Sequence, residues 1–434
     1  MTQRTRRILL GLATLIFLIV GFFMIMYARG YRWDFDKNTF LLSGAVYLKP
    51  VQPSNAQILI NGKDTGKTSA TLIKNLLPAR KYQARVLSDG YQPWEKEFQI
   101  TPGLVTNAEN IVLFPQELKS QILWPETKDL ADFSVSPNQE FIALKTSATK
   151  LFMRDLVNLN ATATPLTFTD RKKTIGITVL KNNKGWSSNS QKFAFARDIA
   201  AKKLWYIWDN PTKNIIDLTS LYERKIVLKQ ASASPLPTKF SPTKIAWLGN
   251  NSFLVLLEGR LFQLDVENET MIDLKLSEIT DFDNFENKIV ALKNPDILML
   301  MDSAVENVSI LGQTQFAPQN ILISPDGSKI AYTDNNSLGI FWLKDTNKQP
   351  LKKLGDQEVI YKTSASISGT YWHASNEHLI FLENQNLKTA ELDTRDRVNT
   401  ATWPETIAAL NYLPQDSKLY ILENSAVKSI DGKF

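Results

Sequence analysis

The sequence predicts an all-β protein with three parts: an N-terminal transmembrane helix, a small β-sandwich and a β-propeller. Three observations lead to this prediction. Residues 8–27 are apolar and hold no charged side chain. Residues 44–115 hold short strand-like runs separated by turns, without helical periodicity. Residues 116–434 repeat one unit, a polar turn followed by two short apolar strands.

Composition argues against several kinds of chemistry. The 434 residues are 43% hydrophobic and 22% charged, which is ordinary for a globular chain of two or three domains. The chain has no cysteine, so disulfides, thiolate nucleophiles and cysteine metal sites are excluded. It has only two histidines, His373 and His378, which leave little material for zinc binding or histidine-based catalysis. We therefore expect no metal and no cofactor.

The net charge of +6 is spread along the chain and does not form long basic runs. The densest basic stretches are residues 4–7 and 171–173. The first lies just before the apolar segment, where basic residues are common at a membrane, and the second is short enough to be a solvated loop. A nucleic-acid partner is therefore not expected.

Residues 8–27 fit a helix that crosses a membrane once. At about 1.5 Å per residue, this stretch covers about 30 Å, the thickness of the hydrocarbon core of a bilayer. The alternative is a cleavable signal peptide, whose apolar core is only about 7–15 residues long and precedes a small-residue cleavage site. Ala28-Arg29-Gly30 is a weak site of this kind, and the long apolar run favours an uncleaved anchor.

The orientation of this anchor does not follow from charge alone, because basic residues flank the apolar run on both sides: Arg4, Arg6 and Arg7 before it, and Arg29, Arg32 and Lys37 after it. The short tail, residues 1–7, and the long region after the helix predict a cytoplasmic tail and extracytoplasmic C-terminal domains. Tyr27, Tyr31 and Trp33 would then form an aromatic belt at the outer interface. We expect residues 28–43 to be a linker.

Residues 44–115 predict a small antiparallel sandwich, with strand-like runs at 45–48, 56–60, 82–86 and 111–114. Asn61-Gly62 directly follows one of these runs and is typical of a tight hairpin turn.

Several motifs in this region resemble those of the PEGA domain: Pro53-Ser54-Asn55-Ala56, residues 61–68, residues 76–82 and Gly90-Tyr91. The tetrapeptide that names the family departs here, with Ser54-Asn55 in place of Glu-Gly. Asparagine tolerates the left-handed backbone region that glycine would use. The resemblance covers most of residues 44–115 and implies an exported, surface-associated β-sandwich without catalytic residues.

Residues 62–68, with the sequence GKDTGKT, superficially look like a phosphate-binding loop. That motif needs four residues between its glycines and must open a helix, so that main-chain N–H groups surround phosphate. Here three residues separate the glycines, and Gly66 is expected in a turn between strands. A nucleotide ligand is therefore not expected.

The repeat is clearest at residues 324–332, with further copies at 136–143 and 187–195 and weaker ones elsewhere. The first apolar residues after the polar turns lie about 46 residues apart on average, close to the length of one four-stranded propeller blade. They are Phe141, Phe193, Phe253, Ile289, Ile330, Leu379 and Leu419. The pattern resembles TolB-like and WD40-like propeller repeats, a resemblance that implies architecture and not function.

Seven copies predict seven blades, although the long gap between the second and third copies leaves six or eight open. The last copy lacks an outer strand, and residues 117–124 before the first copy have no other place. We expect them to supply that strand and close the ring, because an open edge strand promotes aggregation. Residues 231–237, inside the long gap, are expected to be a loop.

No catalytic, cofactor-binding or metal residues are assigned. His373 and His378 are five positions apart, whereas a metal pair needs four on a helix or two on a strand, so a surface or structural role is expected. An aspartate closes the second strand of five copies, which suggests either a carboxylate ring at one rim or turn-stabilising side chains, and we favour the turns. These residues are Asp155, Asp209, Asp265, Asp302 and Asp345.

Five tryptophans lie in or beside the repeats, at Trp186, Trp205, Trp208, Trp342 and Trp372. Packing between blades is the expected role, and a glycan-stacking face is the alternative.

These features together predict a non-catalytic scaffold at the cytoplasmic membrane, which binds an envelope protein or a cell-wall glycan through propeller loops. The alternative is an extracytoplasmic ligand sensor or hydrolase-type enzyme that uses the propeller channel.

Overall fold

The computed structural model describes residues 3–434 except 126–128, 147–148, 159–161, 169–173, 181–183, 201, 228–235, 303–306 and 431–433. The basic stretch 171–173 and most of the expected loop 231–237 therefore lie outside the described residues. The chain forms two compact units. Unit 1 comprises Met1–Gln116, Thr346–Leu351 and Asp393–Asn399, and unit 2 comprises Glu117–Asp345, Lys352–Leu392 and Thr400–Phe434.

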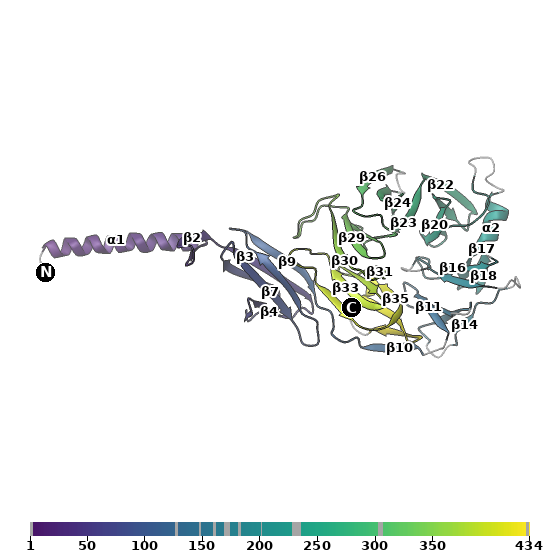
Figure 1. The fold of residues 1–434 in the computed structure, drawn as a ribbon, viewed down its shortest axis with the longest axis horizontal. Helices are drawn as coiled ribbons and strands as arrows, with labels where there is room; N and C mark the ends of the chain where they lie inside the picture. The colour runs from purple at the N-terminus through teal and green to yellow at the C-terminus, as the bar shows by residue number, and fades with distance from the viewer. Residues whose placement is uncertain are drawn as a thin grey trace. The chain divides into compact units, whose positions relative to one another are not determined.

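Unit 1 begins with a long helix, α1 (Gln3–Ala28), which contains the predicted span (Figure 1). None of its residues is buried, and its apolar part has a mean hydropathy of 2.9. The helix is thus long and apolar enough to cross a membrane.

A two-stranded hairpin follows the helix, where we expected only a linker. Strand β1 (Tyr31–Asp34) pairs antiparallel with β2 (Thr39–Leu42). The Asp34 carboxylate accepts a hydrogen bond from the Asp36 main-chain N–H at 3.0 Å, and Asn38 adopts a positive φ of 48°. These turn contacts explain why so short a segment is ordered as strands.

The sandwich of unit 1 consists of two sheets. One has the order β6-β3-β9 and the other β5-β4-β7-β8. Their strands are β3 (Gly44–Gln52), β4 (Gln57–Ile60), β5 (Lys63–Asp64), β6 (Thr71–Leu76), β7 (Lys81–Leu87), β8 (Trp94–Gln99) and β9 (Val105–Val112). Strands β3 and β9 run parallel, so the sandwich is not purely antiparallel as predicted. Alternating side chains such as Val46, Ile58, Val86 and Phe98 form its core.

The hairpin turn predicted at Asn61-Gly62 is confirmed. It joins β4 and β5, and both residues have positive φ values, of 50° and 75°. The next glycine, Gly66, lies between β5 and β6, and its N–H donates to the Asp64 carboxylate at 2.8 Å. This N–H is therefore engaged by the chain itself, in a turn between strands as expected.

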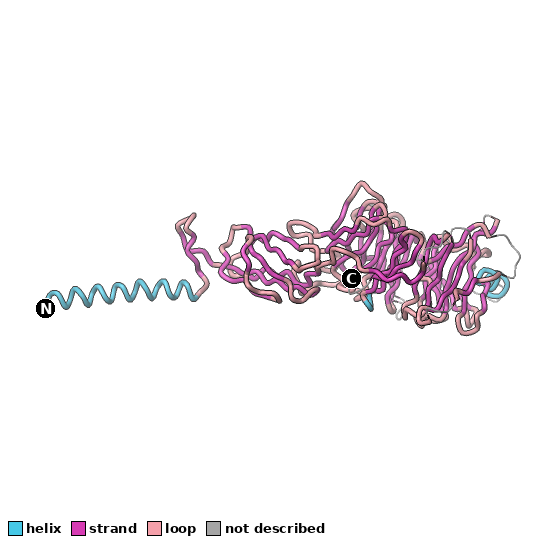
Figure 2. The backbone as a smooth tube through the Cα atoms, turned by 90° about the horizontal axis from the view of Figure 1, so that it is seen from below, coloured by secondary structure: helices cyan, strands magenta, loops and turns pink. Residues whose placement is uncertain are grey.

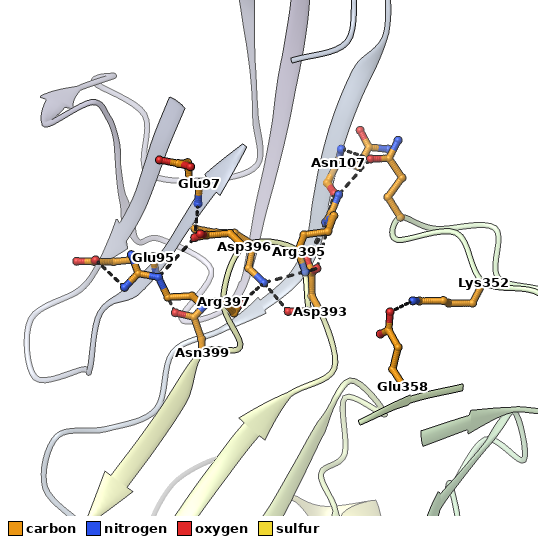
Figure 3. Close-up of polar contacts among 12 residues, drawn as sticks. Glu95, Glu97, Asn107, Lys352, Glu358, Asp393, Arg395, Asp396, Arg397 and Asn399 are labelled. Atoms are coloured by element: carbon orange, nitrogen blue, oxygen red, sulfur yellow. Dashed lines mark hydrogen bonds and ion pairs between the residues drawn. The ribbon is translucent and has the colours of Figure 1, made fainter. Parts of the chain in front are cut away.

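Two segments from later in the chain complete the edges of this sandwich within unit 1. The main-chain N–H groups of Glu95 and Glu97 on β8 donate to the side chains of Asn399 and Asp396, at 3.1 and 2.9 Å (Figure 3). On β9, the Asn107 N–H donates to Gln349, and the Asn107 carbonyl accepts from Arg395. Side chains thus take the place of a further strand along both edges.

Unit 2 is a β-propeller. Its described residues form seven four-stranded antiparallel sheets, which follow one another along the chain (Figure 1). The first four sheets are β11 (Leu130–Val135), β12 (Phe141–Thr146), β13 (Leu151–Asp155), β14 (Thr164–Pro165); β15 (Gly176–Val179), β16 (Lys192–Ile199), β17 (Lys202–Asp209), β18 (Asn214–Asp217); β19 (Lys244–Trp247), β20 (Ser252–Leu257), β21 (Arg260–Asp265), β22 (Thr270–Leu276); and β23 (Ile279–Phe285), β24 (Lys288–Lys293), β25 (Ile297–Asp302), β26 (Asn307–Gln313).

The remaining three sheets are β27 (Asn320–Ile323), β28 (Lys329–Thr333), β29 (Ser337–Trp342), β30 (Gln357–Lys362); β31 (Ile367–Trp372), β32 (His378–Glu383), β33 (Asn386–Glu391), β34 (Thr400–Trp403); and β35 (Ile407–Leu413), β36 (Lys418–Glu423), β37 (Ala426–Ile430) with β10 (Ser120–Trp124). Short helical turns, α2 (Leu218–Leu221) and Tyr222–Ile226, occupy part of the long gap between the second and third repeats.

The ring closes as predicted. Strand β10 pairs antiparallel with β37, so residues from the start of the propeller supply the outer strand of its last sheet. Figure 1 shows β10 beside the yellow strands of the chain's C-terminal end. With β10 in place, the last sheet has four strands like the other six, and β37 has a partner on both sides.

The repeated polar turn has a physical basis in its serine. In residues 324–329, the buried Ser324 hydroxyl donates to the Asp326 carboxylate at 2.6 Å and accepts from the Lys329 N–H at 3.0 Å. Ser136 and Ser187 make the same contacts in their own repeats. The Ser-x-Asx pattern is thus repeated because it ties each inner strand to the next strand of its sheet.

Candidate functional site

Two cavities of the propeller unit are candidate sites. The larger, of about 520 Å³, is a groove lined by the first two sheets, β11–β14 and β15–β18. The smaller, of about 160 Å³, is lined by innermost strands and the turns that follow them. We call these the outer groove and the channel pocket.

Charged side chains of three different sheets meet at the channel pocket and beside it. Lys184 Nζ lies 2.5 Å from Asp283 Oδ1, and Lys244 Nζ lies 2.6 Å from Asp281 Oδ1. The other oxygen of each aspartate accepts a main-chain N–H of β27, from Ile323 at 2.9 Å and Ile321 at 2.8 Å. Both carboxylates therefore link neighbouring sheets.

Burial governs the electrostatics of this cluster. Asp281 and Asp283 are almost fully buried. Burial raises the pKa of Asp281, while the Lys244 ammonium and the Ile321 N–H act in the opposite direction. An acid with raised pKa in a pocket is a signal of catalysis in some enzymes. Here the same carboxylate already binds a lysine and two main-chain N–H groups, which also fits a structural role between sheets.

The outer groove combines aromatic and basic side chains. Phe141, Phe168 and Tyr206 line it together with the buried Arg197. The Arg197 guanidinium lies 3.6 Å from the Phe168 ring centroid and donates to the Thr174 hydroxyl at 2.8 Å. Exposed positions of β14 and β18, including Thr164 and Asn214, lie along the same groove.

Sequence reasoning did not single out this groove, although one signal was available. Arg197 is buried and directly follows the buried apolar run 193–196 of strand β16. A charged side chain inside such a strand needs a special environment, here formed by an aromatic face and hydroxyl groups.

The two histidines have structural positions. His373 replaces the serine of the repeated turn, because its N–H donates to the His378 carbonyl as the Ser324 N–H donates to Lys329. Ser375 bridges the rings, with its hydroxyl 2.8 Å from His373 Nδ1 and 3.1 Å from His378 Nδ1. Both are buried, so of the two roles left open the structural one applies. Burial lowers the pKa of His373 to about 4.

Four of the repeated aspartates make hydrogen bonds with residues that follow them in the chain. Asp155 accepts hydrogen bonds from the N–H groups of Val157 and Asn158, and Asp265 accepts one from Asn268. Asp345 accepts the Leu354 N–H at 2.8 Å, and Asp209 binds the Thr212 hydroxyl. For Asp155 and Asp265, which accept main-chain N–H groups of the turn that follows, the turn interpretation is confirmed.

The five repeat tryptophans are buried, as expected for packing between blades. The indole of Trp186 donates to Ser134 at 3.1 Å and that of Trp372 to the Leu322 carbonyl at 3.0 Å, each on the innermost strand of the preceding sheet. Trp247 makes the equivalent bond to Gly185 at 2.8 Å. Because these rings are enclosed, they cannot form the glycan-stacking face that was the alternative.

The domain assignment follows from this geometry and from comparison with known proteins. The chain has an apolar N-terminal helix, a β-sandwich and a β-propeller, and its sandwich is a PEGA domain, since residues 51–112 match that family. Among solved structures, the chain is similar to the β-propeller domain of Swd1 (Cps50) from Myceliophteria thermophila, with 12% identity and a TM-score of 0.49, over 72% of this chain and 99% of that chain. A likeness at this level indicates nothing about function. Comparison with curated proteins found no match.

Proposed function

We propose that the protein is a membrane-tethered, extracytoplasmic scaffold of the cell envelope, without catalytic activity, whose propeller binds a protein partner. The observation that carries this proposal is the use of the charged side chains at the channel pocket. Lys244 and both aspartates join neighbouring sheets, and Lys184 pairs with Asp283 from a more distant sheet. Groups committed to such contacts are poorly placed to exchange protons with a substrate.

Cavity size also favours a scaffold over a channel-based enzyme or sensor. The channel pocket of about 160 Å³ is smaller than the roughly 300–1,000 Å³ typical of small-molecule sites. The outer groove, at about 520 Å³, is large enough to receive side chains of a partner. Its aromatic and arginine lining has the composition of protein interfaces. A glycan partner is less favoured, because the repeat tryptophans are enclosed.

The helix supports the tethering. No residue of α1 is buried, so the helix exposes an apolar surface that is unfavourable in water and favourable in a bilayer. We assign the C-terminal domains to the extracytoplasmic side because the PEGA resemblance implies export.

The experiment is a crosslinking pull-down with the full-length protein in detergent against envelope extract of its source cells. Thr164→Arg fills the outer groove from an exposed position. The matched control is Ile310→Arg, an exposed position on another outermost strand. Recovery of one or two defined proteins by the wild type and the control, but not by Thr164→Arg, supports the proposal. Recovery of no protein above background would refute a stable protein partner and redirect the search to glycans.

A further inference from the structure

The hairpin after the helix is amphipathic. The register pairs Tyr31 with Leu42 and Trp33 with Phe40, while Arg32 pairs with Leu41 and Asp34 with Thr39. Directly opposed residues of a two-stranded sheet share a face, and alternate residues point to opposite faces. One face therefore carries one aromatic–aliphatic pair and one aromatic pair, and the other carries the charged residues.

The apolar face lies against the helix, within its apolar run. The Phe40 ring is 5.6 Å from that of Phe23 on α1 and 4.9 Å from that of Trp33. Phe23 precedes the end of the apolar run at Tyr27 by about one helical turn, or about 6 Å. If the run spans the bilayer core, Phe40 and Trp33 lie at the level of its outer boundary.

The polar face is tied to the sandwich within unit 1. Arg80 lies 2.8 Å from Asp34 and 2.6 Å from Asp36, and Arg32 donates to Asn75 at 2.6 Å. Arg32 also donates to the Tyr27 carbonyl at 2.9 Å, with its guanidinium 3.7 Å above the Tyr27 ring. The hairpin is thus held from both sides: its aspartates bind Arg80 of the sandwich, and Arg32 contacts both the end of the helix and the sandwich.

Aromatic side chains remain uncovered on this hairpin. Phe35, at its turn, is 81% exposed, and Trp33 is 39% exposed. Figure 2 shows the hairpin projecting sideways from the end of α1. A segment that projects sideways from a spanning helix runs along the membrane surface, where aromatic rings are favoured.

We propose that residues 31–42 form an interfacial membrane-binding element, which inserts Phe35 and the Trp33–Phe40 face into the outer headgroup region of the bilayer that α1 crosses. The partner is the lipid surface itself. This inference rests on the proposed membrane tethering and deepens it, since the hairpin would hold the sandwich at a defined distance from the bilayer.

The absence of cysteine makes site-specific labelling straightforward. Three single-cysteine variants of the full-length protein are labelled with the environment-sensitive dye NBD and reconstituted into phosphatidylcholine vesicles. Phe35→Cys tests the hairpin, Phe17→Cys in the middle of α1 tests the anchor, and Asp89→Cys at an exposed turn of the sandwich is the soluble control. Lipids with spin labels at shallow or deep positions then quench the dye according to depth.

We expect the dye at position 35 to be blue-shifted and quenched at least twofold more by shallow than by deep spin labels. The dye at position 17 should be quenched best by deep labels, and the dye at position 89 by neither. Deep quenching at 17 without shallow quenching at 35 would overturn the interfacial hairpin while leaving the anchor intact. Quenching at neither position would overturn both the anchor and the hairpin.

Discussion

The Lys96 ammonium lies 2.6 Å from the main-chain oxygen of Asp393, although 297 positions separate the two residues in the sequence. Its Nζ also donates to the Arg397 main-chain oxygen at 3.0 Å and lies 3.5 Å from the Asp393 carboxylate. Lys96 is completely buried, on strand β8 of the sandwich. One side chain thus holds a remote segment within unit 1 and satisfies two of its carbonyl groups.

Removal of this contact should strongly destabilise unit 1. Lys96→Ala leaves two buried main-chain carbonyl groups without their donor and removes the positive charge beside the Asp393 carboxylate, at a cost of about 3–5 kcal/mol. Denaturant unfolding of the full-length protein, followed by hydrogen exchange of β8, measures this loss. The control is Lys81→Ala, an exposed lysine paired with Glu97, which should change stability far less because water screens the pair. Equal effects for both variants would contradict the role of Lys96.

The buried serine of the repeated turn should contribute more to the stability of unit 2 than an exposed serine of such a turn. Ser324→Ala removes the acceptor for two main-chain N–H groups, those of Ser328 and Lys329, and should cost about 1–3 kcal/mol. Thermal unfolding of unit 2 is the measurement. Ser188→Ala, at an exposed position of an equivalent turn, should have almost no effect. If the two substitutions shift the unfolding midpoint alike, the repeated hydroxyl is not what stabilises the turn.

His373 should make stability depend on pH. Its pKa is about 4 in the folded protein and about 6.5 when unfolded, so between these values the unfolded chain binds more protons. Stability should therefore be full above about pH 6.5 and fall as the pH drops toward 4, by up to about 3 kcal/mol. His373→Ser restores the residue found in other repeats and should flatten this profile. Denaturation midpoints of both proteins from pH 4 to 8 provide the test, and parallel profiles would rule out His373 as the source.

Ring closure can be tested by a covalent bond between β10 and β37. Gln121 and Ser429 are directly opposed, and such pairs have Cα separations of about 4.5–5.5 Å, which suits a disulfide. Gln121→Cys combined with Ser429→Cys should crosslink on oxidation and stabilise the propeller by about 2–4 kcal/mol. Mobility in a non-reducing gel and the unfolding midpoint with and without reductant report the outcome. Failure to crosslink would mean that these strands do not pair in solution.

Much of the fold was predictable because it depends on local pattern. The Asn61-Gly62 turn, the Ser-x-Asx turns and the apolar strands after them are specified by neighbouring residues, so they can be read in order along the chain. Ring closure was also predictable, since a missing outer strand at one end and a spare strand at the other complement each other.

Among the local elements, the main wrong prediction was the linker at residues 28–43, which contains a hairpin. Residues 31–42 hold only two four-residue strands, and their aromatic side chains are equally consistent with a membrane belt. Such a short hairpin is barely stable by itself, so its order depends on contacts with Phe23 and Arg80, which lie outside it.

The sequence by itself determined the apolar helix, the alternating strands and the repeated turns, because each follows from periodicity and turn chemistry over a few residues. Only the tertiary structure decided which charged side chains form ion pairs between sheets and that Lys96 binds Asp393. It also decided that His373 occupies the position of a turn serine. These outcomes depend on pairs that are distant in the chain, and their energy comes from burial and geometry, which exist only after the strands have assembled.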